Sequence, residues 1–206
     1  MPTIWSMMLV NLVAYLPLKA CQEWGVVIAT SHYGMTVVAG SSLLTWHEVG
    51  GMAAGFAAPI LSDVLGGRRA AVVSGCSALG ALAFGSLAWL VQPPVAGEVT
   101  EAGSQEYLIL VSLFTVAGFG VHGVKTLAGL HAAENSPRTL VGLVGGTLEL
   151  LGQVGAAAAG WPIGALSGGE EGWQPALVVF AGCCVVGAAL GALAQATAPR
   201  EKPKVA

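Results

Sequence analysis

Long runs of apolar residues, separated by short polar segments, repeat along the whole chain. A helix of about 20 mainly apolar residues crosses the hydrocarbon core of a bilayer. The pattern predicts six such spans, at about 4–29, 35–65, 70–91, 107–133, 139–166 and 175–196. We therefore expect an all-α integral membrane protein in which residues 1–206 form one six-helix membrane domain.

The composition points to the same class. Only 9% of the residues are charged, 55% are hydrophobic and 30 are glycine, whereas a water-soluble domain carries about 25% charged residues. Small residues let membrane helices approach closely, because lipid gives no hydrophobic drive for their association. The four cysteines stand in apolar segments without metal-binding spacing, so we interpret them as small hydrophobic residues. The lipid bilayer is the expected partner, and we expect no nucleic acid, metal or cofactor.

Basic residues outside the spans occur in every second loop. Basic residues lie in the second and fourth predicted loops and in the carboxy-terminal tail, whereas acidic residues occupy the third and fifth loops. The positive-inside rule then predicts that both termini are cytoplasmic. The amino terminus has no basic segment before its apolar run, so this run is predicted to be a first span rather than a signal peptide.

Charged side chains within the spans are the first candidates for function, because each costs roughly 2.5–3.5 kcal/mol to place in hydrocarbon. Lys19 lies near the middle of the first span, and Glu23 follows four residues later on the same helical face. Either the two form an intrahelical ion pair that supports insertion, or Lys19 faces a cavity and contacts substrate.

Glu48, Gly51, Gly55 and Pro59 share one stripe of the second span. The two glycines predict the close approach of another helix along this stripe. Glu48 would then pair with a neighbouring helix or take a direct part in substrate binding or gating. His47 lies about 100° around the helix and is interpreted as an interior histidine whose hydrogen bonds are satisfied.

The second span ends in the sequence LSDVLGGRRA, which predicts a tight cytoplasmic turn. Arg68 and Arg69 can bind Asp63 or the carbonyl groups at helix ends, and so latch one arrangement of the helices. The alternative is a charge cluster that only sets the orientation of the chain.

Gly118, His122, Lys125 and Gly129 lie along one face of the fourth span. The glycines leave room for a ligand beside Lys125, and an ammonium group is a compact point charge suited to phosphate. His122 can add a hydrogen-bond donor. We therefore predict that this face binds an anionic substrate.

Two further groups carry weaker signals. His131 lies roughly opposite His122 on an ideal helix and forms an H-x-x-E spacing with Glu134, which could hold a metal if a second such pair were present. Glu149 in the fifth span lies on a glycine-rich stripe, which predicts an interior carboxylate that touches substrate or braces a basic residue.

Three segments carry a resemblance to a known family: LKACQEWG, SSLLTWHEVGGMAAGFAAPILSDVLGGRRA and GFGVHGVKTLAGLHAAENSPRTLVGLVGG. They resemble the organophosphate:phosphate antiporters of the major facilitator superfamily and look closest to the glucose-6-phosphate translocases. The G-L-H-A segment is also similar to bacterial glycerol-3-phosphate transporters. The resemblance implies the carboxy-terminal half of a fold in which substrate binds between two six-helix halves.

The resemblance implies an antiporter, and not an enzyme, that exchanges a sugar phosphate for inorganic phosphate by alternating access. Glucose 6-phosphate is the expected sugar phosphate. The resemblance assigns to Lys19 the basic residue that this half contributes to the phosphoryl group, and to His131 a place at or beside the substrate. Glu48 and Glu149 would hold the basic groups between turnovers.

The resemblance also implies a partner and a location. The partner is the missing amino-terminal half, if the chain is a fragment, or a second copy in parallel. The implied location is the endoplasmic reticulum membrane, with another organelle or the plasma membrane as alternatives.

Two other functions fit parts of the pattern. A noncatalytic phosphate sensor or assembly subunit built on a transporter half would bind phosphates without moving them. A membrane-embedded metalloenzyme would use His47, Glu48, His131 and Glu134 as its ligands.

Overall fold

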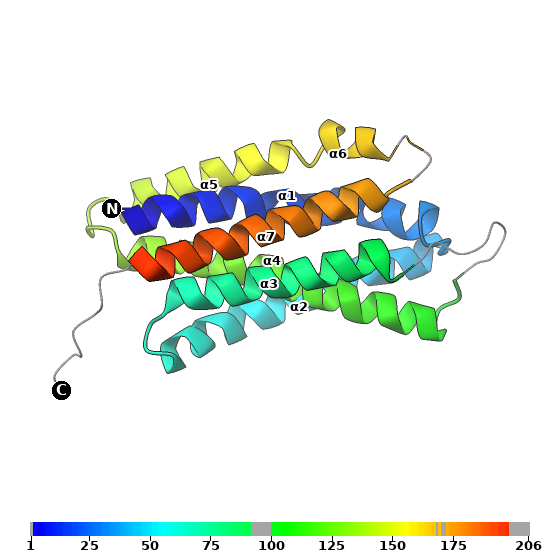
Figure 1. Ribbon diagram of the computed structural model, residues 1–206, viewed down its shortest axis with the longest axis horizontal. Coiled ribbons are helices and arrows are strands. Elements are labelled where there is room, and N and C mark those ends of the chain that lie inside the picture. Colours follow the sequence, from blue (N-terminus) through cyan, green and yellow to red (C-terminus); the bar gives the residue numbers. More distant parts are fainter. Residues whose placement is uncertain (1, 92–99, 168, 170–171, 198–206) are drawn as a thin grey trace.

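Helices make up almost all of the described chain. A computed structural model describes residues 2–91, 100–167, 169 and 172–197. The helices are α1 (Pro2–Ser31), α2 (Val37–Val64), α3 (Arg69–Trp89), α4 (Gln105–Glu134), α5 (Val141–Ala157), α6 (Trp161–Leu166) and α7 (Gln174–Thr197). Figure 1 shows the long helices side by side along one axis. The all-α bundle predicted from the sequence is confirmed.

Five segments of the described chain are long and apolar enough to cross a membrane, namely Ile4–Ser31, Arg69–Trp89, Gln105–Glu134, Val141–Leu166 and Gln174–Thr197. α2 has 28 residues but does not belong to this group. It carries two carboxylates, a histidine and several hydroxyl groups, which lower its mean hydropathy. Five of the six predicted spans therefore have both the length and the apolarity of a membrane helix, and the second has the length alone.

The fifth predicted span, 139–166, is divided into two helices. α5 ends at Ala157 and α6 begins at Trp161, with Pro162 in the first turn of α6. A proline has no backbone N–H to continue an upstream helix, and its fixed φ suits a first turn. Val141–Leu166 therefore still has the length and apolarity of one membrane span, but the proline starts a second helix within it.

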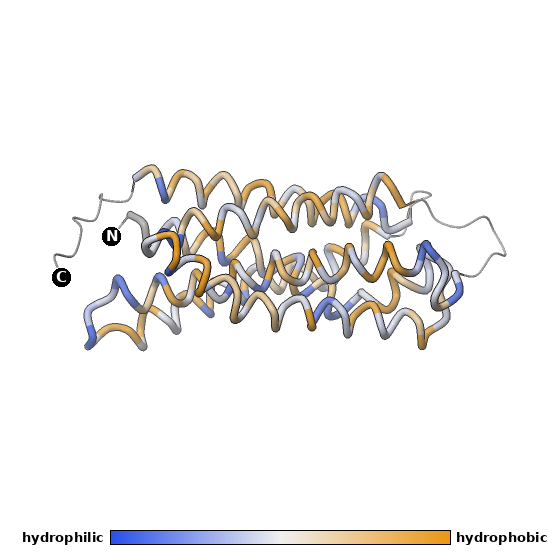
Figure 2. The backbone as a smooth tube through the Cα atoms, turned by 90° about the horizontal axis from the view of Figure 1, so that it is seen from below, coloured by the Kyte–Doolittle hydropathy of each residue, from blue (hydrophilic) through white to orange (hydrophobic). Residues whose placement is uncertain are grey.

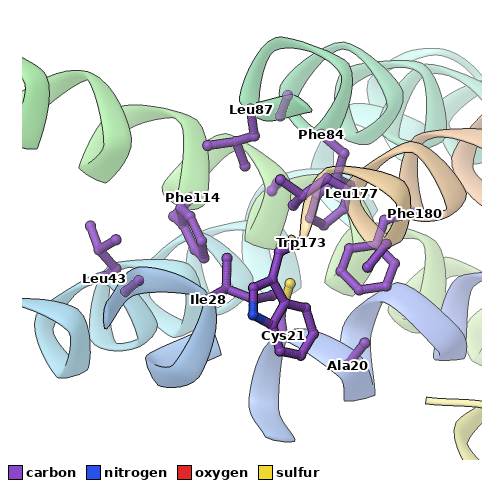
Figure 3. Packing of buried hydrophobic residues seen from close by; sticks show 14 of the residues in the cluster. Ala20, Cys21, Ile28, Leu43, Phe84, Leu87, Phe114, Trp173, Leu177 and Phe180 are labelled. Atoms are coloured by element: carbon purple, nitrogen blue, oxygen red, sulfur yellow. The ribbon is translucent and has the colours of Figure 1, made fainter. Parts of the chain in front are cut away.

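Aromatic side chains fill the core between α1, α2, α3, α4 and α7. Tyr33, Phe84, Phe114 and Phe180 are fully buried, and the rings of Phe84 and Phe180 meet edge to face with centroids 5.5 Å apart. Figure 3 shows Phe84, Phe114 and Phe180 gathered around Trp173. Hydrophobic residues occur along the full length of the helices (Figure 2). Many of the large hydrophobic side chains are exposed. An apolar outer surface suits contact with lipid.

α2 and α4 pack backbone to backbone through reciprocal glycines. A Cβ atom at Gly50 would meet the carbonyl oxygen of Thr115, and one at Gly118 would meet the carbonyl oxygen of His47. Gly55 faces open space, so the close helix contact predicted through it is wrong. The contact lies one turn earlier, where a Cβ atom at Gly51, on the same stripe, would meet the His122 ring.

α5 packs against α1 through two glycines near its end. A Cβ atom at Gly152 would meet the ring of Tyr15, and one at Gly155 would meet the carbonyl oxygen of Leu12. The earlier glycines of α5 have open space beside them, as shown by Gly142, Gly145 and Gly146. α1 thus lies between α5 on one side and α2 and α4 on the other.

Candidate functional site

One face of α1 carries polar side chains at spacings of four, four and three residues. They are Asn11, Tyr15, Lys19 and Gln22. At one end of this line, the Asn11 amide donates to the carbonyl oxygen of Leu148 at 2.9 Å. The Tyr15 hydroxyl donates to the carboxylate of Glu149 at 2.6 Å. This end of the line therefore fixes α1 to α5.

Lys19 lies near the other end of this line and bonds to a neutral group. Its ammonium donates to Oε1 of Gln22 at 3.0 Å, and the Gln22 amide donates to Oε1 of Glu48 at 3.0 Å. Within the described residues, Lys19 and Glu23 form no ion pair, and Glu23 is exposed. The alternative of a Lys19–Glu23 pair is therefore not supported, because Gln22, three residues on, takes the ammonium instead.

Lys125 of α4 lies over an aromatic face. Its nitrogen is 4.9 Å from the centroid of the Tyr15 ring, which is a cation–π distance. Tyr15 in turn donates to Glu149, and the Gln153 amide donates to the same carboxylate at 3.1 Å. In the part of the chain that is described, Lys125 has no ion pair with a carboxylate. Its charge is thus balanced through the phenol rather than by direct contact.

A cavity of about 590 Å³ opens beside these groups. It is lined by Asn11, Pro59, Lys125, Thr126, Gly129, Leu130, Leu148 and Glu149. These residues come from α1, α2, α4 and α5, so the cavity lies on the face that these helices share. Glu149 is exposed, which corrects the prediction of an interior carboxylate. The physical reason is that α5 packs mainly against α1 and only slightly against α4, so much of its surface stays uncovered.

Glu48 lies between two histidines. Its Oε1 is 3.5 Å from Nδ1 of His47, and its Oε2 is 3.6 Å from Nε2 of His122. The two imidazole rings meet edge to face with centroids 5.6 Å apart. His47 has no exposed side-chain surface, yet neither of its ring nitrogens has a hydrogen-bond partner. His47 is thus interior as predicted, but its hydrogen bonds are not satisfied, because the facing Glu48 oxygen lies at 3.5 Å without forming one.

Arg69 joins three helices at the end of the bundle. Its guanidinium forms ion pairs with Asp63 at 2.7 Å and Glu134 at 2.8 Å, and it donates to the carbonyl oxygen of Pro59 at 3.2 Å. Arg69 therefore makes the contacts predicted for the latch, with Asp63 and with a backbone carbonyl group. Arg68 is exposed and has no ion pair within the described residues, so it is not part of the latch here.

The H-x-x-E pair of α4 does not come together as a metal site. Glu134 is engaged by Arg69, and Nε2 of His131 is buried without a hydrogen-bond partner. Among the described residues, the group of three potential ligands that does meet is His47, Glu48 and His122. The four-residue set of the metalloenzyme alternative is therefore not assembled, because His131 is absent from this group and Glu134 serves the latch.

Three contributors to the site were missed by reasoning from charge alone. Asn11, Tyr15 and Gln22 are neutral, so they did not stand out in an apolar span. Their spacing from Lys19 is the signal that could have found them, because residues three and four apart share one helical face.

The chain is similar to two kinds of curated membrane protein. It is 31% identical over 163 residues, or 79% of its length, to the membrane sensor protein UhpC of Escherichia coli (strain K12). It is 30% identical over 163 residues to the sensor of the same name from Salmonella typhimurium. Over 210 residues, it is 27% identical to the hexose-6-phosphate:phosphate antiporter of Salmonella typhimurium.

These similarities cover only part of each relative. The chain spans 34% of the length of each sensor and 42% of the length of the antiporter. No family model matches the sequence. The apolar helices and the membrane proteins to which the chain is similar together identify it as a multi-pass membrane protein.

Proposed function

We propose that the chain belongs to the organophosphate:phosphate antiporter family and forms the carboxy-terminal six-helix half of a transporter. The transporter exchanges a sugar phosphate, with glucose 6-phosphate as the expected substrate, for inorganic phosphate by alternating access. One observation carries the proposal. Lys19 and Lys125 each place an ammonium within a predicted membrane span beside a neutral partner, and Lys125 also lines a cavity.

An incoming phosphate must displace the partner of each ammonium group, so the strength of that existing contact matters. An ammonium locked to a carboxylate would have to break a strong ion pair, whereas the Gln22 amide and the Tyr15 ring are weaker competitors. Glu48 and Glu149 lie one hydrogen bond beyond these partners. They supply the countercharge when substrate is absent, without blocking either ammonium.

The two histidines receive different roles. His122 adjoins Glu48 on the shared face, from where it adds a donor to the phosphoryl group. His131 lies further along α4, beyond the cavity-lining residues Gly129 and Leu130. Its place beside the substrate rests on the resemblance to glycerol-phosphate transporters.

The face shared by α1, α2, α4 and α5 is where we place the second half. It carries the cavity and the exposed Glu149. A substrate bound there would be enclosed by the missing amino-terminal half or by a second copy of this chain. Both termini are proposed to be cytoplasmic. The endoplasmic reticulum remains the proposed membrane from the resemblance alone, since the curated relatives are bacterial.

Exchange in liposomes tests the transport proposal. The full-length protein should take up labelled phosphate, and glucose 6-phosphate on the opposite side should stimulate that uptake. Lys19→Ala should abolish the stimulated uptake, because the phosphoryl group loses its ammonium partner. Arg138→Ala is the matched control, since it removes an exposed positive charge between α4 and α5. Undiminished exchange in Lys19→Ala would refute the role of this lysine.

A sensor is the second candidate, and a specific observation favours it. The two relatives at 30% and 31% identity are both named membrane sensors. A sensor would bind glucose 6-phosphate at the same lysines and release nothing on the other side. Saturable binding together with an absence of stimulated flux would select this candidate.

A further inference from the structure

We propose that His47, Glu48 and His122 form a binding site for one divalent transition-metal ion, and that Zn²⁺ suits it best. Each residue offers one ligand atom, and these atoms all lie within 4.8 Å of one another. The histidines come from α2 and α4, so the ion would join the two helices. Two imidazoles and one carboxylate are a known donor set for Zn²⁺ and for Fe²⁺.

The distances fit a metal better than they fit hydrogen bonds. The carboxylate oxygens are 3.5 Å and 3.6 Å from the facing nitrogens of His47 and His122, which is too long for a good hydrogen bond. Bonds of about 2.0–2.2 Å to a tetrahedral ion would separate the ligand atoms by about 3.3–3.6 Å. Both nitrogen–oxygen separations are close to this range, and the two histidines face different oxygens of Glu48. The three ligand atoms lie within 4.8 Å of one another, so the side chains would close by up to about 1.5 Å around one ion.

The facing nitrogens also lack other partners. Both ring nitrogens of His47 and Nε2 of His122 are buried without a hydrogen bond. A buried polar atom without a partner is costly, and a metal ion would satisfy two of these atoms at once. The side chain of Glu48 is 42% exposed, so the carboxylate gives the ion a way in from the shared face.

Neighbouring residues hold the ligands in place. The Gln22 amide donates to Glu48 Oε1, and the orientation of a ligating carboxylate depends on such bonds. A Cβ atom at Gly118 would meet the His47 backbone, and one at Gly51 would meet the His122 ring, so both histidines are fixed by close helix packing. Lys125 and Lys19 are the positive charges near His122. Neither pairs with Glu48, because Lys19 donates to Gln22 and Lys125 lies over the Tyr15 ring.

Metal binding by the purified full-length protein in detergent tests this site, after removal of any histidine tag. Equilibrium dialysis should find one Zn²⁺ per chain. Co²⁺ should give the visible absorption of a tetrahedral complex. Glu48→Gln and His122→Gln should each weaken binding by at least roughly tenfold. His131→Gln is the matched control, because it removes a half-buried histidine on the same helix that does not belong to the cluster.

Three results would overturn the proposal: no saturable binding at one ion per chain, an octahedral Co²⁺ spectrum, or an equal loss of affinity in His131→Gln. The Co²⁺ spectrum is recorded on the unmodified protein, so the test survives if a variant fails to fold. None of these measurements depends on transport. Failure of the exchange assay and failure of metal binding are therefore separate results.

Discussion

Two lysines within the predicted membrane spans have neutral partners, and the proposed binding of phosphate depends on this feature. Lys19 donates to the Gln22 side chain, and Lys125 lies over the Tyr15 ring. A lysine in a membrane span is costly and is usually retained for function. Neutral partners lower that cost without cancelling the charge. Both ammonium groups therefore stay available to an anion.

Removing the ammonium of Lys125 should weaken phosphate binding. A hydrogen bond to a charged group contributes about 1.5–3 kcal/mol, which corresponds to roughly a ten- to hundredfold change in affinity. We expect Lys125→Ala to raise the phosphate concentration for half-maximal exchange by that factor, and Lys125→Arg to restore part of the loss. An unchanged concentration dependence in Lys125→Ala would exclude a direct contact.

At the scale of single residues, charge and spacing predicted part of the site. Lys19, Glu48, Lys125 and His122 were found because ionisable groups stand out in apolar spans. The pairing between them was not predictable, because it depends on which helices are neighbours. Gln22, which separates Lys19 from Glu48, is recognisable only once α2 is known to lie against α1.

Among the helices, glycine decides how closely the pairs approach. α2 and α4 meet through Gly50 and Gly118, whose missing side chains admit the facing backbone. This contact places His47 and Glu48 of α2 beside His122 of α4. The sequence showed many glycines but not which of them face a neighbour. Several faces of a helix can carry glycines, and only the packed structure shows which face contacts a neighbouring helix.

Adding one methyl group at Gly50 should separate α2 from α4. The new Cβ atom would collide with the Thr115 carbonyl oxygen, and overpacking costs typically about 1–3 kcal/mol. We expect Gly50→Ala to lower the temperature at which the protein loses its monodisperse peak in size-exclusion chromatography. Gly55→Ala is the matched control on the same helix, because open space lies beside it. It should be neutral or slightly stabilising, as alanine favours a helix. Equal behaviour of the two variants would contradict the α2–α4 contact.

The contacts of Arg69 lead to a second prediction about how the helices are held together. Arg69 holds the end of α2 and the end of α4 through Asp63 and Glu134. Its side chain is 9% exposed, but its partners are 65% and 44% exposed, so water screens part of the interaction. We expect Arg69→Ala to cost about 1–3 kcal/mol of stability, and Arg68→Ala to cost little. Thermal stability in detergent measures both, and equal losses would show that only net charge matters.

For the whole molecule, the sequence predicted the all-helical class and the approximate limits of the long apolar helices. It could do so because bilayer thickness fixes the length of an apolar run. Two features depended on more local physics. Pro162 divides the fifth span, and the polar residues of α2 reduce its apolarity below that of its neighbours. The assembly of α1, α2, α4 and α5 around a cavity had no signal in the hydrophobic pattern.

The orientation of the bundle in the membrane is the prediction that belongs to the whole molecule. Figure 1 shows the start of α1, the α2–α3 turn and the α4–α5 turn at the same end of the bundle. This end carries Arg68, Arg69 and Arg138, whereas Glu101 lies at the opposite end, just before α4. Positive charge is retained on the cytoplasmic side. We therefore expect the arginine end to be cytoplasmic.

Labelling of single cysteines in intact cells measures this orientation. The four native cysteines would first be replaced by serine, since all are free thiols. A membrane-impermeant maleimide added outside should label Glu101→Cys directly, because that residue is exposed on the far side. It should label Arg68→Cys, which is equally exposed, only after permeabilisation. The reverse labelling pattern would show that the predicted orientation is wrong. The cavity beside Lys125 would then lie in the half of the bundle nearer the extracytoplasmic side.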